Sequence, residues 1–282
     1  MSQRRLVSER MAMLFDLNVA VPSAAGLMAY YKFDSNAPLL DSASTLGDLQ
    51  SAGNPSFPSS GPWSGTNYAS PCVALTSDSD SSGGGQFLQL NPINLGSMSA
   101  AGGFSICSWF VYDQVTELAR IFDFGLGPYY NNVVLRRQSS STDLWLESYC
   151  GQSNQAQPYF FFPDPIQLGQ WRHVCIVNQG AQWDFYDNGQ HVGSQTSSCS
   201  LQDVMTTFNY IGRSDWSLAD NRLLVGRVAE FRIYSRRLSA SDVTAVYAYR
   251  GAVSPLLHHH LLPSPRLAPH FRHPTLLVMD PR

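Results

Sequence analysis

Between residues 26 and 251 the chain is a succession of short apolar runs separated by turn sequences. Each run has the length of a β-strand, and no helical periodicity lies between the runs. Many short strands without intervening helices fold as an antiparallel sandwich or barrel. The sequence therefore predicts an all-β fold, and the clearest strands are expected at 104–112, 118–124, 133–137, 144–149, 174–177, 183–186, 209–212 and 228–234.

Two tight-turn sequences predict how three strands are connected. Gln179-Gly180-Ala181 and Asp187-Asn188-Gly189 contain glycine or asparagine, which tolerate the positive φ angles of hairpin turns. They predict paired hairpins built from strands at 172–178, 182–186 and 190–193.

The strand at 104–112 is apolar on both faces. Phe104, Ile106 and Phe110 share one face, while Cys107 and Trp109 take the other. Such a strand either lies between two layers or has the core on one side and a groove on the other.

One short helix is predicted near the end of this region. Ser239 is a suitable N-cap, and Asp242 completes a short acidic variant of the capping box. Val243, Val246 and Tyr247 then form an apolar stripe. We expect this helix to close one end of the sandwich.

The segments on either side differ from the strand-rich region. Residues 1–25 read as a weakly structured leader, in which Glu9 and Asp16 interrupt a faint signal-peptide pattern. From residue 252 the pattern gives way to a segment rich in proline, histidine and arginine, expected to be a flexible tail, with metal binding by His258–His260 as the alternative. The expected organisation is leader 1–25, sandwich 26–251 and tail 252–282.

Charge and hydropathy exclude two classes of partner. The net charge is -3, so the chain lacks the basic surface that nucleic acid requires. No apolar run approaches the roughly 20 residues of a membrane span.

Several short segments occur in the order typical of one family. They are Leu27-Met-Ala-Tyr-Tyr-Lys-Phe-Asp34, Phe104-Ser-Ile-Cys-Ser-Trp109, Arg120-Ile-Phe-Asp-Phe-Gly125 with Asn131-Asn132, Trp171-Arg-His-Val, Trp183-Asp-Phe-Tyr-Asp-Asn-Gly189, Ile211-Gly-Arg-Ser-Asp-Trp216 and Gly226-Arg-Val-Ala-Glu-Phe-Arg-Ile-Tyr234. Together they resemble the laminin-G-like jelly-roll domains of the concanavalin-A-like lectin and glucanase superfamily. The resemblance implies a two-sheet antiparallel jelly-roll sandwich with one convex and one concave sheet, and often a structural calcium ion. Members of the family typically have an acidic pair where this chain has Ala229-Glu230. An acidic residue is also common in the family where this chain has Asn131.

Catalytic signatures are missing from the strand-rich region. The hydrolases that share this fold carry their two carboxylates on one strand as Glu-x-Asp-x-Glu. Glu117, Glu147 and Glu230 each lack an acidic residue two positions away, and no Gly-x-Ser-x-Gly elbow is present. His173 is interpreted as a hydrogen-bonded structural residue.

We therefore expect a non-catalytic recognition or adhesion module, outside the cell or at its surface, that binds a glycan or an extracellular protein. A purely structural domain and a divergent carbohydrate-active enzyme are the alternatives.

Aromatic and arginine side chains are the candidate ligand-binding residues. If Phe104 and Ile106 fill the core, Trp109 lines a trough on the other face of its strand. Tyr129, Tyr130 and Trp216 are expected to flank the rim of this trough. Arg136, or its neighbour Arg137, is expected to bind an acidic sugar or a carboxylate.

A calcium site is expected at the edge of the sandwich. Calcium takes six to eight oxygen ligands, and Asp123 with Asn131 or Asn132 supplies hard oxygens near one turn, with Asp34 at the first strand. The alternative is that Asp123 only accepts N–H bonds from the turn.

The five cysteines predict disulfides if the protein is secreted. Cys150 and Cys199 each follow a strand into a loop, where they are expected to pair. Cys107 and Cys175 lie within strands and are interpreted as buried thiols. Cys72 is expected to be unpaired.

Overall fold

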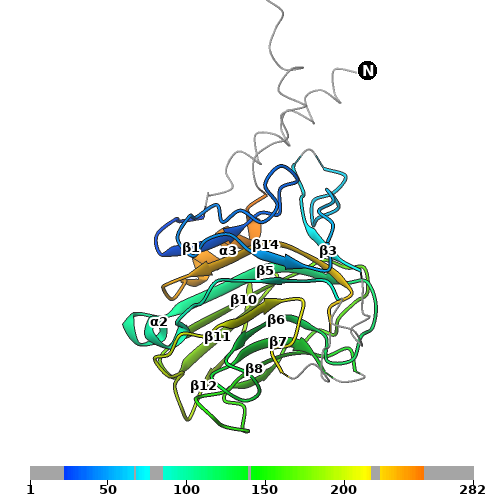
Figure 1. Ribbon diagram of the computed structural model, residues 1–282. Helices are drawn as coiled ribbons and strands as arrows, with labels where there is room; N and C mark the ends of the chain where they lie inside the picture. Colours follow the sequence, from blue (N-terminus) through cyan, green and yellow to red (C-terminus); the bar gives the residue numbers. More distant parts are fainter. Residues whose placement is uncertain (1–21, 67, 77–84, 139–140, 217–222, 251–282) are drawn as a thin grey trace, which may run out of the picture.

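The protein folds into two antiparallel β-sheets (Figure 1). The computed structural model describes residues 22–66, 68–76, 85–138, 141–216 and 223–250. The first sheet, sheet A, runs β1-β14-β5-β10-β11-β12, with β3 paired to β14. The second, sheet B, runs β2-β4-β13-β6-β7-β8-β9. Sheet A comprises β1 (Leu27–Tyr31), β3 (Val73–Leu75), β5 (Phe104–Tyr112), β10 (Arg172–Gln179), β11 (Gln182–Asp187), β12 (Gln190–Thr196) and β14 (Gly226–Tyr234). Sheet B comprises β2 (Gln50–Ala52), β4 (Phe87–Gln89), β6 (Arg120–Gly125), β7 (Val133–Arg137), β8 (Leu144–Ser148), β9 (Tyr159–Phe161) and β13 (Phe208–Ile211). The predicted all-β sandwich is confirmed.

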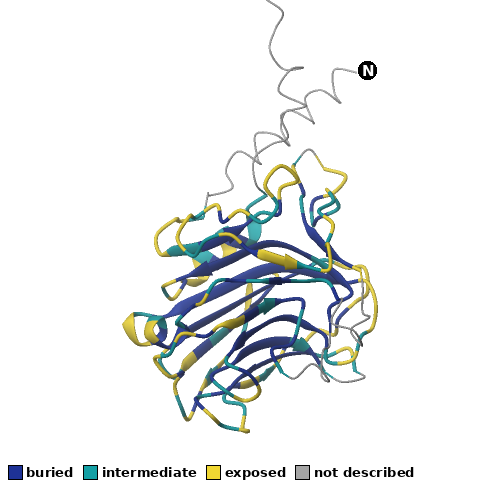
Figure 2. Ribbon diagram, viewed as in Figure 1, coloured by how far each residue is buried: buried dark blue, intermediate teal, exposed yellow. Residues whose placement is uncertain are grey.

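The core lies between the sheets, where the central strands of both are buried (Figure 2). Phe104, Ile106 and Phe110 of β5 enter this core, as their shared face predicts. Phe122 and Phe124 of β6 contribute from sheet B. The predicted hairpins β10-β11-β12 form, with Asn188 and Gly189 both at positive φ in the second turn.

Helix α3 (Ala240–Ala248) begins with the predicted capping box. The Ser239 hydroxyl accepts the Asp242 N–H at 3.2 Å, and an Asp242 carboxylate oxygen accepts the Ser239 N–H at 3.0 Å. The expectation that this helix closes one end of the sandwich is wrong. Val243 and Val246 pack against the outer face of sheet A, because the outward-facing residues of its strands are apolar there.

A second helix, α2 (Leu95–Ala101), was not predicted. Asn94 caps it by accepting the Ser97 N–H at 2.9 Å. Its sequence lacks an apolar stripe, so periodicity did not mark it. None of the helices in the described ranges is long and apolar enough to cross a membrane. The predicted leader 1–25 lies mostly, and the tail 252–282 entirely, outside the described residues.

Two disulfides link the cysteines. Cys150 pairs with Cys199, as predicted, and Cys72 is a buried free thiol. The interpretation of Cys107 and Cys175 as thiols is wrong, because they are directly opposite each other on β5 and β10 and form a disulfide. That pairing depends on strand register, which cysteine spacing does not show.

Thiol counting on the denatured, unreduced protein is expected to find one free thiol per chain, that of Cys72. Five free thiols would show that both disulfides are absent.

Candidate functional site

Helix α3 and the segment around Trp63 cover the part of the outer face of sheet A on which Trp109 lies. Trp109 lies on the face opposite Phe104 and Ile106, as predicted, but it is only 7% exposed. The Tyr247 ring stacks on it with centroids 5.3 Å apart, and Trp63 meets it edge-on at 6.0 Å. The prediction that Trp109 lines an open trough is therefore wrong, because helix α3 fills the space where the trough was expected.

The buried face of sheet A also holds His173. Its ring packs on Trp109, with centroids 5.3 Å apart, and burial lowers the pKa of His173 to about 3. The His173 backbone exchanges two hydrogen bonds with Asn188, while its Nδ1 has no partner among the described residues. A neutral, enclosed imidazole fits the structural role that the sequence predicts.

The outer face of sheet B carries polar and aromatic side chains across all seven strands. Directly paired residues of an antiparallel sheet point to the same face. Register therefore places one row across this face, made of Gln50, Gln89, Tyr210, Asp123, Val134, Glu147 and Tyr159. A second row contains Arg120, Arg136, Trp145 and Phe161.

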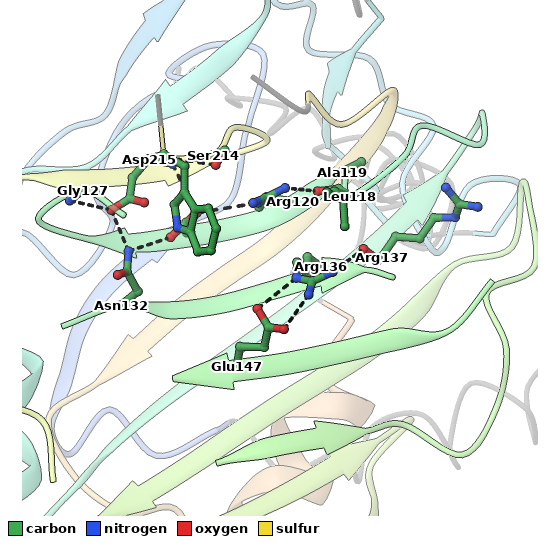
Figure 3. A network of polar contacts seen from close by, with 12 residues as sticks. Leu118, Ala119, Arg120, Gly127, Asn132, Arg136, Arg137, Glu147, Ser214 and Asp215 are labelled. Carbon is green, nitrogen blue, oxygen red and sulfur yellow. Dashed lines mark hydrogen bonds and ion pairs between the residues drawn. The ribbon is translucent and has the colours of Figure 1, made fainter. Parts of the chain in front are cut away.

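A buried network joins two carboxylates at the centre of this face. The Asn132 side-chain amide donates to Asp215 at 2.8 Å and to Asp123 at 3.4 Å, and Figure 3 shows it pointing at Asp215. The Gly127 N–H donates to Asp215 at 3.1 Å, and the Asp215 N–H donates to Asp123 at 3.2 Å. The Arg120 guanidinium lies 3.7 Å from Asp123.

Burial raises the pKa of both carboxyls of this network. For Asp215 the neighbouring Asp123 carboxylate raises the pKa further, because two negative charges this close repel each other. For Asp123 the positive Arg120 acts against burial and keeps the rise smaller. The pair thus favours holding a proton, chiefly on Asp215.

Aromatic rings gather beside this network, at the edge formed by the loop after β6 and the segment after β13. The ring of Tyr129 lies 4.4 Å from that of Trp216 and 5.4 Å from that of Tyr149, measured between centroids. Trp216 is half-buried and lies over the Arg120 guanidinium at 5.6 Å. Tyr129 is exposed, so these rings offer an accessible apolar edge beside polar groups.

A second cluster occupies β7, β8 and β9. Arg136 makes a two-bonded ion pair with Glu147 at 3.0 and 2.5 Å, as Figure 3 shows. Arg136 also lies 5.3 Å from the centroid of Trp145, which is flanked by the exposed rings of Tyr159 and Phe161. Since Glu147 already occupies the Arg136 guanidinium, an acidic ligand would have to compete with an internal partner.

The structure brings several of the predicted ligand-binding residues onto one face. Trp216, Tyr129 and Arg136 lie on or beside the outer face of sheet B, and the half-buried Tyr130 is next to Tyr129 and forms a bridge to Gln152. Sequence patterns did not indicate six residues of this face: Arg120, Trp145, Glu147, Tyr159, Phe161 and Asp215. The alternation Trp145-Leu146-Glu147 could have indicated two of them, since it places both side chains opposite an inward leucine.

The four predicted calcium ligands do not converge on one site. Asp123 and Asn132 meet, but the Asp123 oxygens accept the Asn132 side-chain amide and the distant Asp215 N–H, so turn N–H groups are not, as the alternative supposed, their only partners. The side chain of Asn131 is bonded in both directions to the backbone of Gln202, and the exposed Asp34 accepts the Asn36 N–H in a separate turn. Within the described ranges, no three acidic, histidine or cysteine side chains form a metal-binding group. The four residues therefore do not form a single site, and calcium binding stays a prediction.

A family model described as the concanavalin A-like lectin/glucanases superfamily matches residues 82–244. The chain belongs to this superfamily. A comparison of the lectin/glucanase-like domain with curated proteins gave no match.

Solved structures share the fold of this lectin/glucanase-like domain at low sequence identity. Domain 4 of AbnA, an extracellular GH43 arabinanase from Geobacillus stearothermophilus, was solved with arabinotriose. It is 20% identical over 79% of this chain and 98% of its own, with a TM-score of 0.54. The binding domain of botulinum neurotoxin DC was solved with SialylT, at 13% identity and a TM-score of 0.56, and with rat synaptotagmin II, at 14% and 0.57. In both, 79% of this chain matches 51% of the other, so the present chain spans about half of those proteins.

The buried carboxyl pair predicts how stability depends on pH. A carboxyl whose pKa is higher in the folded than in the unfolded state stabilises the fold at low pH and loses this contribution as pH rises. Asp215→Asn removes the titrating group but keeps an oxygen for the Gly127 N–H and the Asn132 amide. We expect the melting temperature of the wild type to fall more steeply than that of this variant between about pH 5 and pH 8. Parallel curves would show that Asp215 ionises as readily in the fold as in the unfolded chain.

Proposed function

We propose that this domain is a non-catalytic recognition module that binds a glycan across the outer face of sheet B. The observation that carries the proposal is the exposed Tyr129 ring beside the half-buried Trp216, at the edge of that face. Flat rings suit the C–H faces of sugars. Fold neighbours solved with arabinotriose and SialylT support the glycan class.

An extracellular location is part of the proposal. The Cys107–Cys175 and Cys150–Cys199 disulfides support it, because such bonds persist in oxidising compartments.

One observation favours the second candidate, a divergent glycoside hydrolase. Asp123 and Asp215 form a carboxyl pair in which Asp215 favours the protonated state, as a general acid would. Asp123 is fully buried and Asp215 is 8% exposed, and a sugar would need to lie between them for catalysis. Their oxygens are instead linked by the Asn132 amide and backbone N–H groups. This arrangement supports a structural role for the pair.

The test is a glycan array in calcium and in chelator, followed by calorimetry on any glycan retained. Trp216→Ala and Tyr129→Ala are each expected to weaken binding at least about tenfold, since central aromatic contacts dominate such interfaces. Leu40→Ala, which removes an exposed apolar side chain next to sheet A, is the matched control and should leave affinity unchanged. Equal binding in chelator is expected.

The other results each contradict a part of the proposal. No retained glycan, or full affinity in both aromatic variants, would favour a purely structural domain. Cleavage of a bound glycan that stops in Asp215→Asn would favour the hydrolase. Binding that needs calcium would show that an ion takes part in recognition.

A further inference from the structure

A hollow of about 280 Å³ lies where residues 164–172 pass the end of β5 and the start of β10. Its floor is apolar and buried, formed by Phe110, Tyr112 and Ile166. Its rim is exposed and polar, and includes Asp164, Gln167, Gln170 and Asn188. An apolar base with a few polar groups around it is the usual composition of a small-molecule site.

Backbone hydrogen bonds hold the rim of this hollow in place. The Ile166 N–H donates to the Thr142 carbonyl at 2.7 Å, and the Gly169 N–H donates to the Tyr112 carbonyl at 2.9 Å. The Arg172 guanidinium donates to the Asp164 carbonyl at 2.7 Å. A ligand would therefore meet a loop that is already ordered, which lowers the entropic cost of binding.

The rim side chains are available to a ligand. Within the described part of the chain, the side chains of Asp164, Gln167 and Gln170 make no hydrogen bond. The two glutamine amides can donate to and accept from hydroxyl groups, and the Asp164 carboxylate can accept from them.

The charges around the hollow favour an uncharged ligand. Arg172 and Asp187 form an ion pair at 2.5 and 3.0 Å, so their charges largely cancel. The exposed Asp164 carboxylate would repel an acidic sugar, and a simple ammonium ion would leave the Gln167 and Gln170 amides without hydroxyl partners. The volume is slightly below the roughly 300 Å³ at which pockets for drug-sized ligands begin.

We propose that this hollow is a second binding site, which takes one uncharged sugar residue. The sugar places its C–H face on the half-buried ring of Trp171 and its hydroxyls toward Gln167, Gln170 and Asp164. The half-buried Trp171 lines the same hollow and reports on its occupation. None of the residues that line it belongs to the glycan face proposed on sheet B, so the two sites can be tested separately.

The test is an NMR titration of the full chain that follows the Trp171 indole N–H. The probes are methyl β-D-galactopyranoside, methyl α-D-glucopyranoside and methyl α-L-arabinofuranoside, with the methyl glycoside of N-acetylneuraminic acid and n-butylammonium as charged comparisons. At least one neutral probe is expected to shift this signal saturably, with millimolar affinity. Gln167→Ala combined with Gln170→Ala should weaken that binding at least about tenfold, since two hydrogen bonds are lost. Gln190→Ala, an exposed amide on β12, is the control and should bind as the wild type does.

Three results would overturn the proposal. They are the absence of a saturable shift with every neutral probe, equal or tighter binding of a charged probe, and unchanged affinity in the double variant. Trp216→Ala should leave this titration unchanged, so failure of the sheet B proposal and failure of this one are distinguishable. The melting temperature of the double variant, expected to match the wild type, shows that lost binding is not lost folding.

Discussion

Replacing Trp109 by alanine is expected to lower the free energy of unfolding by about 3–5 kcal/mol, as for other buried tryptophans. The indole is enclosed by Tyr247 of α3, by Trp63 and by His173, with ring centroids 5.3 to 6.0 Å away. Its removal leaves a cavity between sheet A and the helix that covers it. Urea denaturation of the purified variant measures the loss.

Two further variants test whether the loss of stability comes from the packing of the Trp109 ring. Trp109→Phe keeps an aromatic ring against Tyr247 and should lose less stability than Trp109→Ala. Trp216→Ala should also lose less, because Trp216 is half-buried at the edge of sheet B. A loss below about 1 kcal/mol for Trp109→Ala would mean that α3 does not cover this face, and an open trough at Trp109 would again be a candidate site.

Replacing Arg232 by methionine is expected to cost about 3–5 kcal/mol at neutral pH, because it leaves a buried charge without its partner. Arg232 is 3% exposed and lies 2.5 Å from Glu230, which is 4% exposed and also accepts the Tyr30 hydroxyl. Burial raises the pKa of Glu230, and Arg232 opposes that rise. Without Arg232 the pKa should rise further, so the variant should lose stability as pH increases above the ordinary glutamate value of about 4.3.

A second substitution tests the cause of this loss. Adding Glu230→Gln to Arg232→Met removes the unpaired charge and should restore a large part of the stability at neutral pH. Arg227→Met is the control, since Arg227 and its partner Asp113 are 22% and 37% exposed and such pairs contribute about 1 kcal/mol or less. A double variant no more stable than Arg232→Met alone would show that lost packing, rather than the unpaired carboxylate, causes the effect.

Local patterns predicted the framework of this domain well. Turn residues placed the hairpins β10-β11-β12, and the spacing of Ser239 and Asp242 placed the start of α3. These features depend on backbone preferences of a few neighbouring residues, which the sequence contains directly. Helix α2 was missed because a short helix held by a cap and by tertiary contacts needs no apolar stripe.

The location of the candidate site depended on contacts between distant residues. Cys107 and Cys175 are 68 positions apart and meet through the register of β5 and β10. Asp123 and Asp215 are 92 positions apart and meet because the segment after β13 passes β6. The sequence shows Arg232, the charged partner of Glu230, two residues along the chain. It does not show that both side chains are buried.

The sequence by itself determined that the chain forms an antiparallel sandwich, which strands have two apolar faces, and which residues begin and end its turns. Only the tertiary structure decided which outer face is covered. Alternation along β5 shows that Trp109 lies opposite the core, but it carries no information on what packs over that side of the sheet. That depends on where α3, near the end of the described domain, packs, and burial of its apolar stripe against sheet A covers the side of β5 on which Trp109 lies.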